Sequence, residues 1–204
     1  MNSRLKRIPD LGESRLVALS ASGENGIRLT LLPLVGERTS VVVSKDAFDK
    51  LGAPTKGELL PEAQVAAFVE AANLRGALRH AANILGYGDN SERTLTQKLR
   101  AMGYQQGEIA YALHRVKELG LMSEMDGAVR RAESAARKGW SRRKVYAYLL
   151  SRGYSSETAK AAIAEGERSG EIDFEENRRR FIEEKREKGL DPTEIRAALY
   201  RAGF

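Results

Sequence analysis

Seven basic side chains lie within eighteen residues of this sequence, between Gly127 and Lys144, with Glu133 as the single acidic residue among them. The seven are Arg130, Arg131, Arg137, Lys138, Arg142, Arg143 and Lys144. Arginine predominates, and its planar guanidinium forms paired hydrogen bonds with phosphate or carboxylate groups. The window carries a charge of +6, equal to the formal net charge of all 204 residues. The chemistry it predicts is the binding of an anionic partner.

A helix is predicted from Met125 to Lys138. At 100° per residue, its four basic residues fall within one arc of about 120°. Alanines occupy the opposite side, which predicts a thin packing face and a basic face turned outward. The other three cations open the next predicted helix, where each opposes the helix dipole at a cost of about 0.3–1 kcal/mol. A solvated helix face is the simplest alternative, but three cations there favour an anionic partner.

Trp140 lies at the corner between the two basic stretches, where it can stack on a base, fill a partner's pocket or act as a local hydrophobic plug. A second basic run, Arg178–Arg180, is interspersed with glutamates and predicts a solvated helix with i,i+4 ion pairs. The predicted binding surface therefore consists of the seven cations and the tryptophan: Arg130, Arg131, Arg137, Lys138, Trp140, Arg142, Arg143 and Lys144.

Residues suited to catalysis or metal binding are few. The chain has no cysteine and two histidines, His80 and His114, on different predicted helices. Neither histidine has a carboxylate at a spacing typical of metal ligands. The glycines at 86 and 88 are not followed by the Lys-Ser/Thr pair of a phosphate-binding loop. We therefore predict a protein that is not an enzyme and that needs no metal and no cofactor.

The elements that would position the basic surface begin with a small sheet. Three segments rich in Val, Leu, Ile and Thr predict strands: Arg15–Ser22, Gly26–Pro33 and Arg38–Ser44. The Asn25-Gly26 pair predicts the positive φ angles of the first turn. Helices over Lys45–Leu51 and Glu62–Ala72 are expected to cover the sheet. We predict a flexible N-terminus at 1–14 and a β-rich module at 15–72.

From residue 73 onward the pattern becomes helical and recurs every fifty residues. Ser91, Ser141 and Asp191 predict helix N-caps at equal spacing. Gly103, Gly153 and Gly203 each follow a helical run and precede an aromatic residue, with leucine four positions before, as in a Schellman ending. We predict a mainly α protein with three-helix repeats at 73–123 and 124–173 and a truncated two-helix repeat at 174–204. Stacked repeats would form an elongated, curved array.

The ordered set of these motifs resembles the RecX family. The segments that carry the resemblance are Ala77-Leu78-Arg79, Leu85-Gly86-Tyr87, Ser91-Glu92-Arg93-Thr94-Leu95, Gly103-Tyr104 and Arg137-Lys138-Gly139-Trp140. The resemblance covers about residues 15–204. Family members usually have acidic residues and a Phe-Ala pair where this chain has Ser123, Glu124 and Gly127-Ala128, and the third helix of the last repeat is absent.

The resemblance implies a regulator that lies along RecA filaments on single-stranded DNA and also contacts DNA. It implies suppression of ATP hydrolysis, strand exchange and RecA-assisted cleavage of the SOS repressor, and so a role in DNA repair and homologous recombination. Two alternatives stay open: a direct binder of single-stranded or duplex DNA, and a general helical-repeat adaptor. Because the apolar runs are short, we expect no signal peptide and no membrane span, and a monomeric, cytoplasmic protein.

Overall fold

Four antiparallel strands form the N-terminal sheet of the computed structural model, which describes residues 6–204. They are β1 (Ser14–Ala21), β2 (Gly26–Pro33), β3 (Thr39–Ser44) and β4 (Leu59–Leu60), in the order β3-β2-β1-β4. The three predicted strands are confirmed, and β4 adds two residues that pair with the start of β1. The predicted turn is wrong in one detail: the residue with positive φ between β1 and β2 is Gly23, not Asn25 or Gly26.

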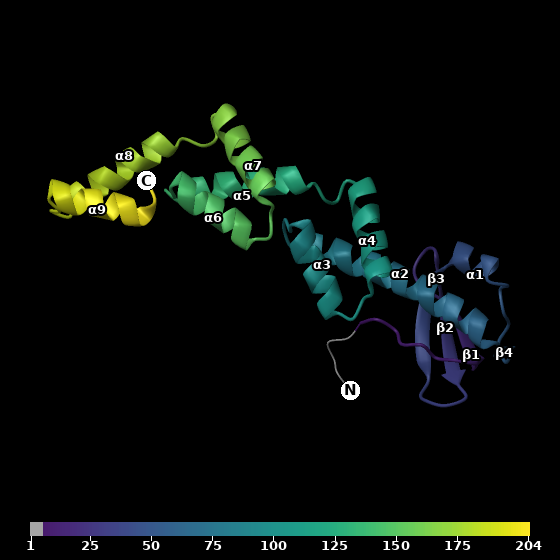
Figure 1. Ribbon diagram of the computed structural model, residues 1–204. Helices are drawn as coiled ribbons and strands as arrows, with labels where there is room; N and C mark the ends of the chain where they lie inside the picture. Colours follow the sequence, from purple (N-terminus) through teal and green to yellow (C-terminus); the bar gives the residue numbers. More distant parts are fainter. Residues whose placement is uncertain (1–5) are drawn as a thin grey trace. The chain divides into compact units, whose positions relative to one another are not determined.

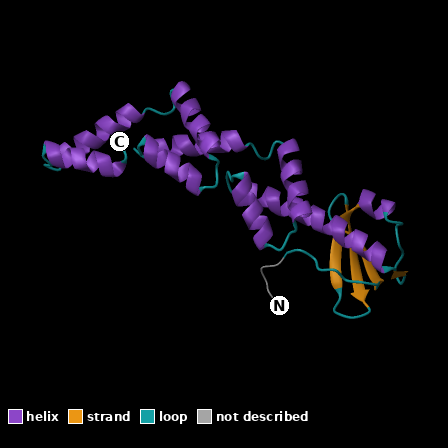
Figure 2. Cartoon of the chain, viewed as in Figure 1, coloured by secondary structure: helices purple, strands orange, loops and turns teal. Residues whose placement is uncertain are grey.

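Two helices lie against this sheet: α1 (Lys45–Lys50) and α2 (Glu62–Gly86) (Figures 1 and 2). Alternate residues of β2 and β3 point towards α2, because side chains along a strand alternate between its two faces. Leu29, Val41 and Val43 are fully buried there with Phe68 of α2. The module boundary expected at 72/73 lies inside α2, which continues without a break as the first helix of the repeat region.

The chain after α2 consists of helices joined by short turns, as predicted. They are α3 (Glu92–Ala101), α4 (Gln106–Glu118), α5 (Glu124–Ala136), α6 (Arg142–Ser151), α7 (Ser156–Arg168), α8 (Phe174–Glu187) and α9 (Pro192–Ala202). The chain divides into two compact units. The first extends to Ile84 and includes Thr96–Leu119, and the second comprises Leu85–Leu95 and Gly120–Phe204.

Residues 6–8, which lie in the N-terminal segment that we expected to be flexible, make specific contacts with the rest of the first unit. The amide of Lys6 donates to the carbonyl of Met102 at 2.8 Å. The side-chain amide of Asn73 accepts from the Ile8 N–H at 2.8 Å and donates to the Ile8 carbonyl at 3.0 Å. Arg7 forms an ion pair with Glu108 at 2.9 Å. These contacts hold the segment against α2 and α4; residues 1–5 lie outside the described part of the chain.

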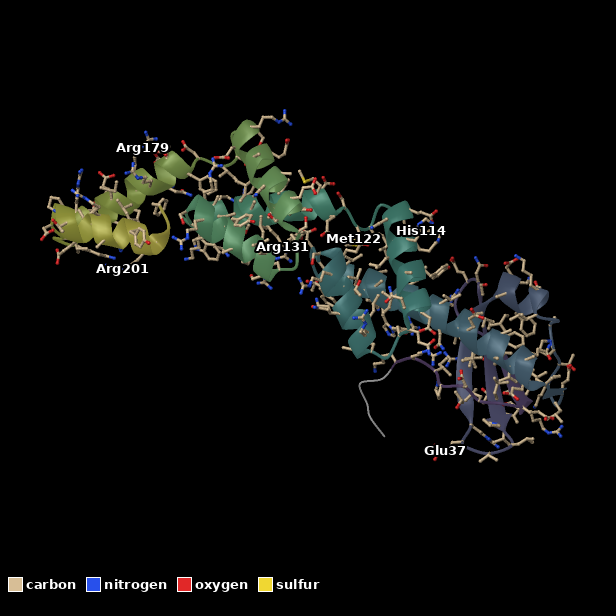
Figure 3. The ribbon with its side chains drawn as sticks, viewed as in Figure 1. Glu37, His114, Met122, Arg131, Arg179 and Arg201 are labelled. Carbon is tan, nitrogen blue, oxygen red and sulfur yellow. The ribbon has the colours of Figure 1, made fainter. Side chains whose placement is uncertain are left out.

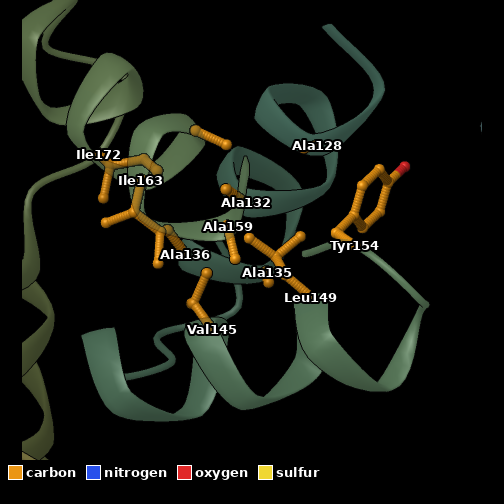
Figure 4. Close-up of a cluster of buried hydrophobic side chains, with 11 residues drawn as sticks. Ala128, Ala132, Ala135, Ala136, Val145, Leu149, Tyr154, Ala159, Ile163 and Ile172 are labelled. Carbon is orange, nitrogen blue, oxygen red and sulfur yellow. The ribbon is translucent and has the colours of Figure 1, made fainter. Parts of the chain in front are cut away.

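The core of the second unit is built mainly from α5, α6 and α7 (Figure 4). Ala128 and Ala132 of α5 are fully buried, and Ala135 and Ala136 nearly so, against Leu149 and other apolar residues of α6 and α7. Small side chains let helix axes approach closely, which is why α5 packs through alanine. The predicted alanine face of α5 is therefore confirmed.

The three predicted Schellman endings are present after α3, α6 and α9. Gly103, Gly153 and Gly203 have φ angles of +92°, +88° and +83°. The amide of the aromatic residue that follows each glycine donates to the carbonyl of the leucine four residues before the glycine, at 3.1–3.3 Å. A glycine is favoured at such a position because it adopts the left-handed conformation without a steric penalty.

Two of these endings are seated on the N-cap serine of another helix. The hydroxyl of Ser91 donates to the carbonyl of Arg152 at 2.8 Å, and the hydroxyl of Ser141 donates to the carbonyl of Ala202 at 2.7 Å. Both pairs are separated by 61 residues, and one is the other displaced by fifty. We call each such contact a serine joint. The sequence repeat thus corresponds to a repeated contact within the second unit.

Candidate functional site

The cations of the Gly127–Lys144 window fall into three groups in the structure, according to their partners. Arg130 of α5 pairs with Asp89, with Nε 3.0 Å from Oδ2 and Nη2 2.5 Å from Oδ1. The hydrogen bond from Arg130 holds the pKa of Asp89 below its ordinary value, and the same bond raises the pKa of Arg130. The guanidinium stays largely exposed, so Arg130 forms a two-pronged surface ion pair.

Arg131 is half-buried between α5 and α6, where Figure 3 labels it. Its guanidinium donates to the Tyr148 hydroxyl at 3.2 Å and to the backbone carbonyl of Asp89. The prediction that Arg131 faces outward is wrong, because it lies at the edge of the basic arc, where α6 covers it. Its role in the structure is to position Tyr148 and the segment before α3.

Arg137 and Arg142 are exposed but lie near carboxylates of their own unit. Arg137 is 4.0 Å from Glu133 and 3.9 Å from Glu171. Arg142 pairs with Glu167, and its guanidinium lies 5.5 Å from the centre of the Phe174 ring. Exposed ion pairs contribute about 0–1 kcal/mol each, so both arginines can exchange these carboxylates for groups on a partner at little cost.

Lys138, Arg143 and Lys144 have no carboxylate partner within residues 6–204. The ammonium of Lys144 lies 4.3 Å from the centre of the Trp140 ring, and that of Lys138 lies 5.8 Å from it. Ser141 caps α6 by accepting from the Lys144 amide at 3.3 Å, and this places Arg143 and Lys144 in the first turn of the helix, while Lys138 follows the end of α5. They are the open charges of the predicted surface.

Aromatic and basic residues alternate along one side of α6. Trp140, Lys144, Tyr148 and Arg152 follow one another at a spacing of four, and we call them the aromatic–basic row. The Trp140 and Tyr148 rings meet edge to face with centres 5.5 Å apart, and the Arg152 guanidinium lies 5.1 Å from the Tyr148 ring centre. Cations over ring faces stabilise such a stack. Trp140 is half-buried and also packs against the hydrophobic core.

The charges of the row change the titration of Tyr148. Burial raises the pKa of this phenol, but the hydrogen bond from Arg131 and the charges of Arg152 and Arg131 lower it by more. The net direction is down. The sequence singled out Trp140 and Lys144 but not Arg152. The signal for Arg152 was the spacing of four residues that links Trp140, Lys144, Tyr148 and Arg152.

A cleft of about 360 Å³ adjoins the row within the second unit. Trp140, Arg143 and Lys144 line one wall of this cleft, and Phe181, Arg201 and Phe204 line another. Arg143 also lines a larger groove of about 880 Å³ over Ile163, Ile172 and Phe174. Two of the open charges, Arg143 and Lys144, thus border concave surface, which suits the insertion of a partner's group.

Residues 6–204 contain neither a cluster of metal ligands nor a membrane-spanning helix. The structure brings no three His, Asp or Glu side chains together as a metal would require. None of the helices in this part of the chain has the length and apolar character needed to span a bilayer.

The fold defines a class: a small antiparallel sheet followed by recurring helical units. No family model matches the sequence, and no curated protein matches it either. Among solved structures, the crystal structure of a protein described as regulatory protein RecX matches with a TM-score of 0.67 at 14% identity, covering 94% of this chain and 94% of that one. RecX from Lactobacillus salivarius matches with a TM-score of 0.57 at 16% identity, covering 65% of this chain and 88% of that one. The chain has the RecX fold, in agreement with its sequence resemblance.

Proposed function

We propose that this protein is a non-enzymatic, cytoplasmic regulator that binds RecA filaments and lowers their recombinase, ATPase and coprotease activities. The observation that carries the proposal is the match to the RecX fold along 94% of the chain. The motifs of the sequence resemblance support it independently of the fold comparison. Such a regulator would act in DNA repair and the SOS response.

The surface we assign to filament binding is the predicted one, with roles revised according to the contacts. Lys138, Arg143, Lys144 and Trp140 make direct contact. Arg130, Arg137 and Arg142 contribute after exchanging their own carboxylates for groups of the filament, and Arg131 acts by positioning Tyr148. Arg143 and Lys144 border concave surface, which supports this assignment.

The test is RecA ATPase activity on single-stranded DNA, titrated with the wild type and with the triple variant K138Q/R143Q/K144Q. Three exposed charge contacts of about 0.5 kcal/mol each predict a roughly tenfold higher concentration for half-inhibition. The matched control is R168Q/R179Q/R180Q, which removes the same charge from arginines that pair with Glu165 and Glu176. The control should inhibit as the wild type does.

Two outcomes would contradict the proposal at different levels. Equal inhibition by the wild type and the triple variant would remove this surface from filament binding. No inhibition by the wild type, with no binding to RecA–DNA filaments, would overturn the function itself.

Direct binding to DNA is the second candidate function, and the aromatic–basic row favours it. Single-stranded nucleic acid is bound by rings that stack on bases beside cations that contact phosphates. If the four cations without carboxylate partners (Lys138, Arg143, Lys144 and Arg152) contact phosphates, log K against log[salt] should have a slope of about −3; all seven cations of the window would give about −5. Tight binding to RecA filaments with a slope near zero on bare DNA would exclude this candidate.

A further inference from the structure

A small pocket of about 200 Å³ in the first unit has a basic lining. It lies between α2, the edge strand β3 and residues 6–8. Its charged lining residues are Lys6, Arg75 and Arg79, and its polar ones are Ser40, Asn73 and Tyr104; no acidic residue lines it. The pocket is separate from the cationic window, which belongs to the second unit.

Local structure places each of these groups. Arg75 and Arg79 are one turn apart on α2, so they project from the same face of the helix. Gly76 lies between them, and a Cβ atom there would be 2.8 Å from the Tyr104 hydroxyl, so only glycine lets the tyrosine reach the pocket. The backbone amide of Lys6 donates a hydrogen bond to the carbonyl of Met102, and the side chain of Asn73 holds the backbone of Ile8 nearby.

The charges around the pocket are not neutralised within residues 6–204. The carboxylate group of Glu108, whose charge acts on Tyr104, accepts from Arg7 at 2.9 Å and from the Gln105 amide at 2.7 Å. Lys6, Arg75 and Arg79 form no ion pair with a described residue. Three like charges around a concave surface repel one another, and an anion that enters the pocket relieves the repulsion.

His80 lies next to the pocket and reports its charge. Nδ1 of His80 is 2.8 Å from the Tyr104 hydroxyl. Burial lowers the pKa of His80, and the charges of Arg79 and Lys6 lower it further. Burial raises the pKa of Tyr104 to about 12, so this hydroxyl stays protonated. When His80 donates to the tyrosine oxygen, the tyrosine O–H is free to donate into the pocket.

We propose that this pocket binds a phosphate group. Two guanidinium groups, an ammonium group and the hydroxyls of Ser40 and Tyr104 match the several oxygens of a phosphate better than the two of a carboxylate. The phosphate belongs either to a nucleic-acid backbone or to a small molecule such as a mononucleotide or inorganic phosphate. The site does not rest on the proposed function, because its residues lie in the first unit and form none of the surface assigned to RecA.

The experiment is NMR of the full chain, with histidine side chains followed while inorganic phosphate, AMP or a short oligothymidylate is added at constant ionic strength set by chloride. His80 should shift on binding and its pKa should rise, since the anion offsets Arg79 and Lys6. His114 is the internal control because its side chain is 71% exposed beside Glu118. R75Q and R79Q should each weaken binding about tenfold, whereas R100Q, on the same unit, should not.

The probes distinguish the sources of phosphate. Equal affinity for all three indicates a small phosphate ligand, whereas tenfold tighter binding of the oligonucleotide indicates a nucleic-acid backbone. A His80 resonance that none of the three moves overturns the site, as does a shift that persists unchanged in R75Q and R79Q. K6Q provides a third variant should either arginine change alter the circular dichroism of the fold.

Discussion

Gly153→Ala should destabilise the second unit far more than alanine at Gly170, a left-handed glycine with open space around it. The φ of Gly153 is +88°, and a Cβ atom there would lie 2.6 Å from the Ser91 hydroxyl and 2.9 Å from the Thr94 hydroxyl. Both hydroxyls donate to the Arg152 carbonyl at 2.8 Å, and Ser91 also caps α3 by accepting from the Thr94 amide at 3.2 Å. The added methyl group therefore displaces the serine joint.

The magnitude follows from these contacts. Alanine in the left-handed conformation costs about 1 kcal/mol. Each lost hydrogen bond adds about 1 kcal/mol, and loss of the cap adds about 1 kcal/mol more. We expect the free energy of unfolding to fall by about 3–4 kcal/mol. Gly170 is the matched control: its φ is +77° and a Cβ atom there meets nothing within 4 Å, so Gly170→Ala should cost about 1 kcal/mol.

Urea unfolding followed by fluorescence is the assay, because the single tryptophan of the chain, Trp140, lies in the second unit and reports on it. Ser91→Ala combined with Gly153→Ala should be less destabilising than the sum of the two separate changes, since both act on one joint. Equal losses for Gly153→Ala and Gly170→Ala would refute the reasoning, because strain alone would then account for both.

Three further predictions concern the second unit. Arg130 lowers the pKa of Asp89, so their ion pair stabilises the fold above the pKa of the unfolded state and loses this effect as pH falls through the pKa of the folded state. Asp89→Asn should therefore lower the free energy of unfolding, measured by urea titration, by at most about 0.5 kcal/mol at pH 7 and not at all in acid. Arg152→Gln should raise the pKa of Tyr148, measured as tyrosinate absorbance, and an unchanged titration would contradict the assigned contact. Asn177→Ala should cost about 2 kcal/mol in urea unfolding, because its buried side-chain amide donates to two backbone carbonyls; a loss below 0.5 kcal/mol would show that these carbonyls find other donors.

Local pattern was enough to predict most of the fold. Caps, glycine endings and the alanine face of α5 are set by residues within a few positions of one another, so the sequence displays them directly. The boundary predicted at 72/73 falls inside α2, because the change from sheet cover to repeat does not interrupt the helix. β4 was missed because two residues leave no periodic signal.

The site was predicted less completely, because charge pairing depends on contacts that are distant in sequence. Arg130 meets Asp89 across 41 residues, and Arg142 meets Glu167 across 25. Helical periodicity placed Arg131 correctly on α5, but it could not show that α6 covers that edge of the arc. The basic pocket of the first unit was also beyond local pattern, since it joins residues 6, 75 and 104 through the fold.

The serine joints also show which positions of the fifty-residue repeat are constrained. Their acceptor is a main-chain oxygen, so the side chains at 152 and 202 can vary in evolution without weakening the contact. The donor cannot vary so freely. At the third equivalent place stands Asp191, whose carboxylate accepts from the amides of Thr193 and Glu194. The third N-cap therefore keeps the capping role of the two serines but lacks the hydroxyl that makes a serine joint.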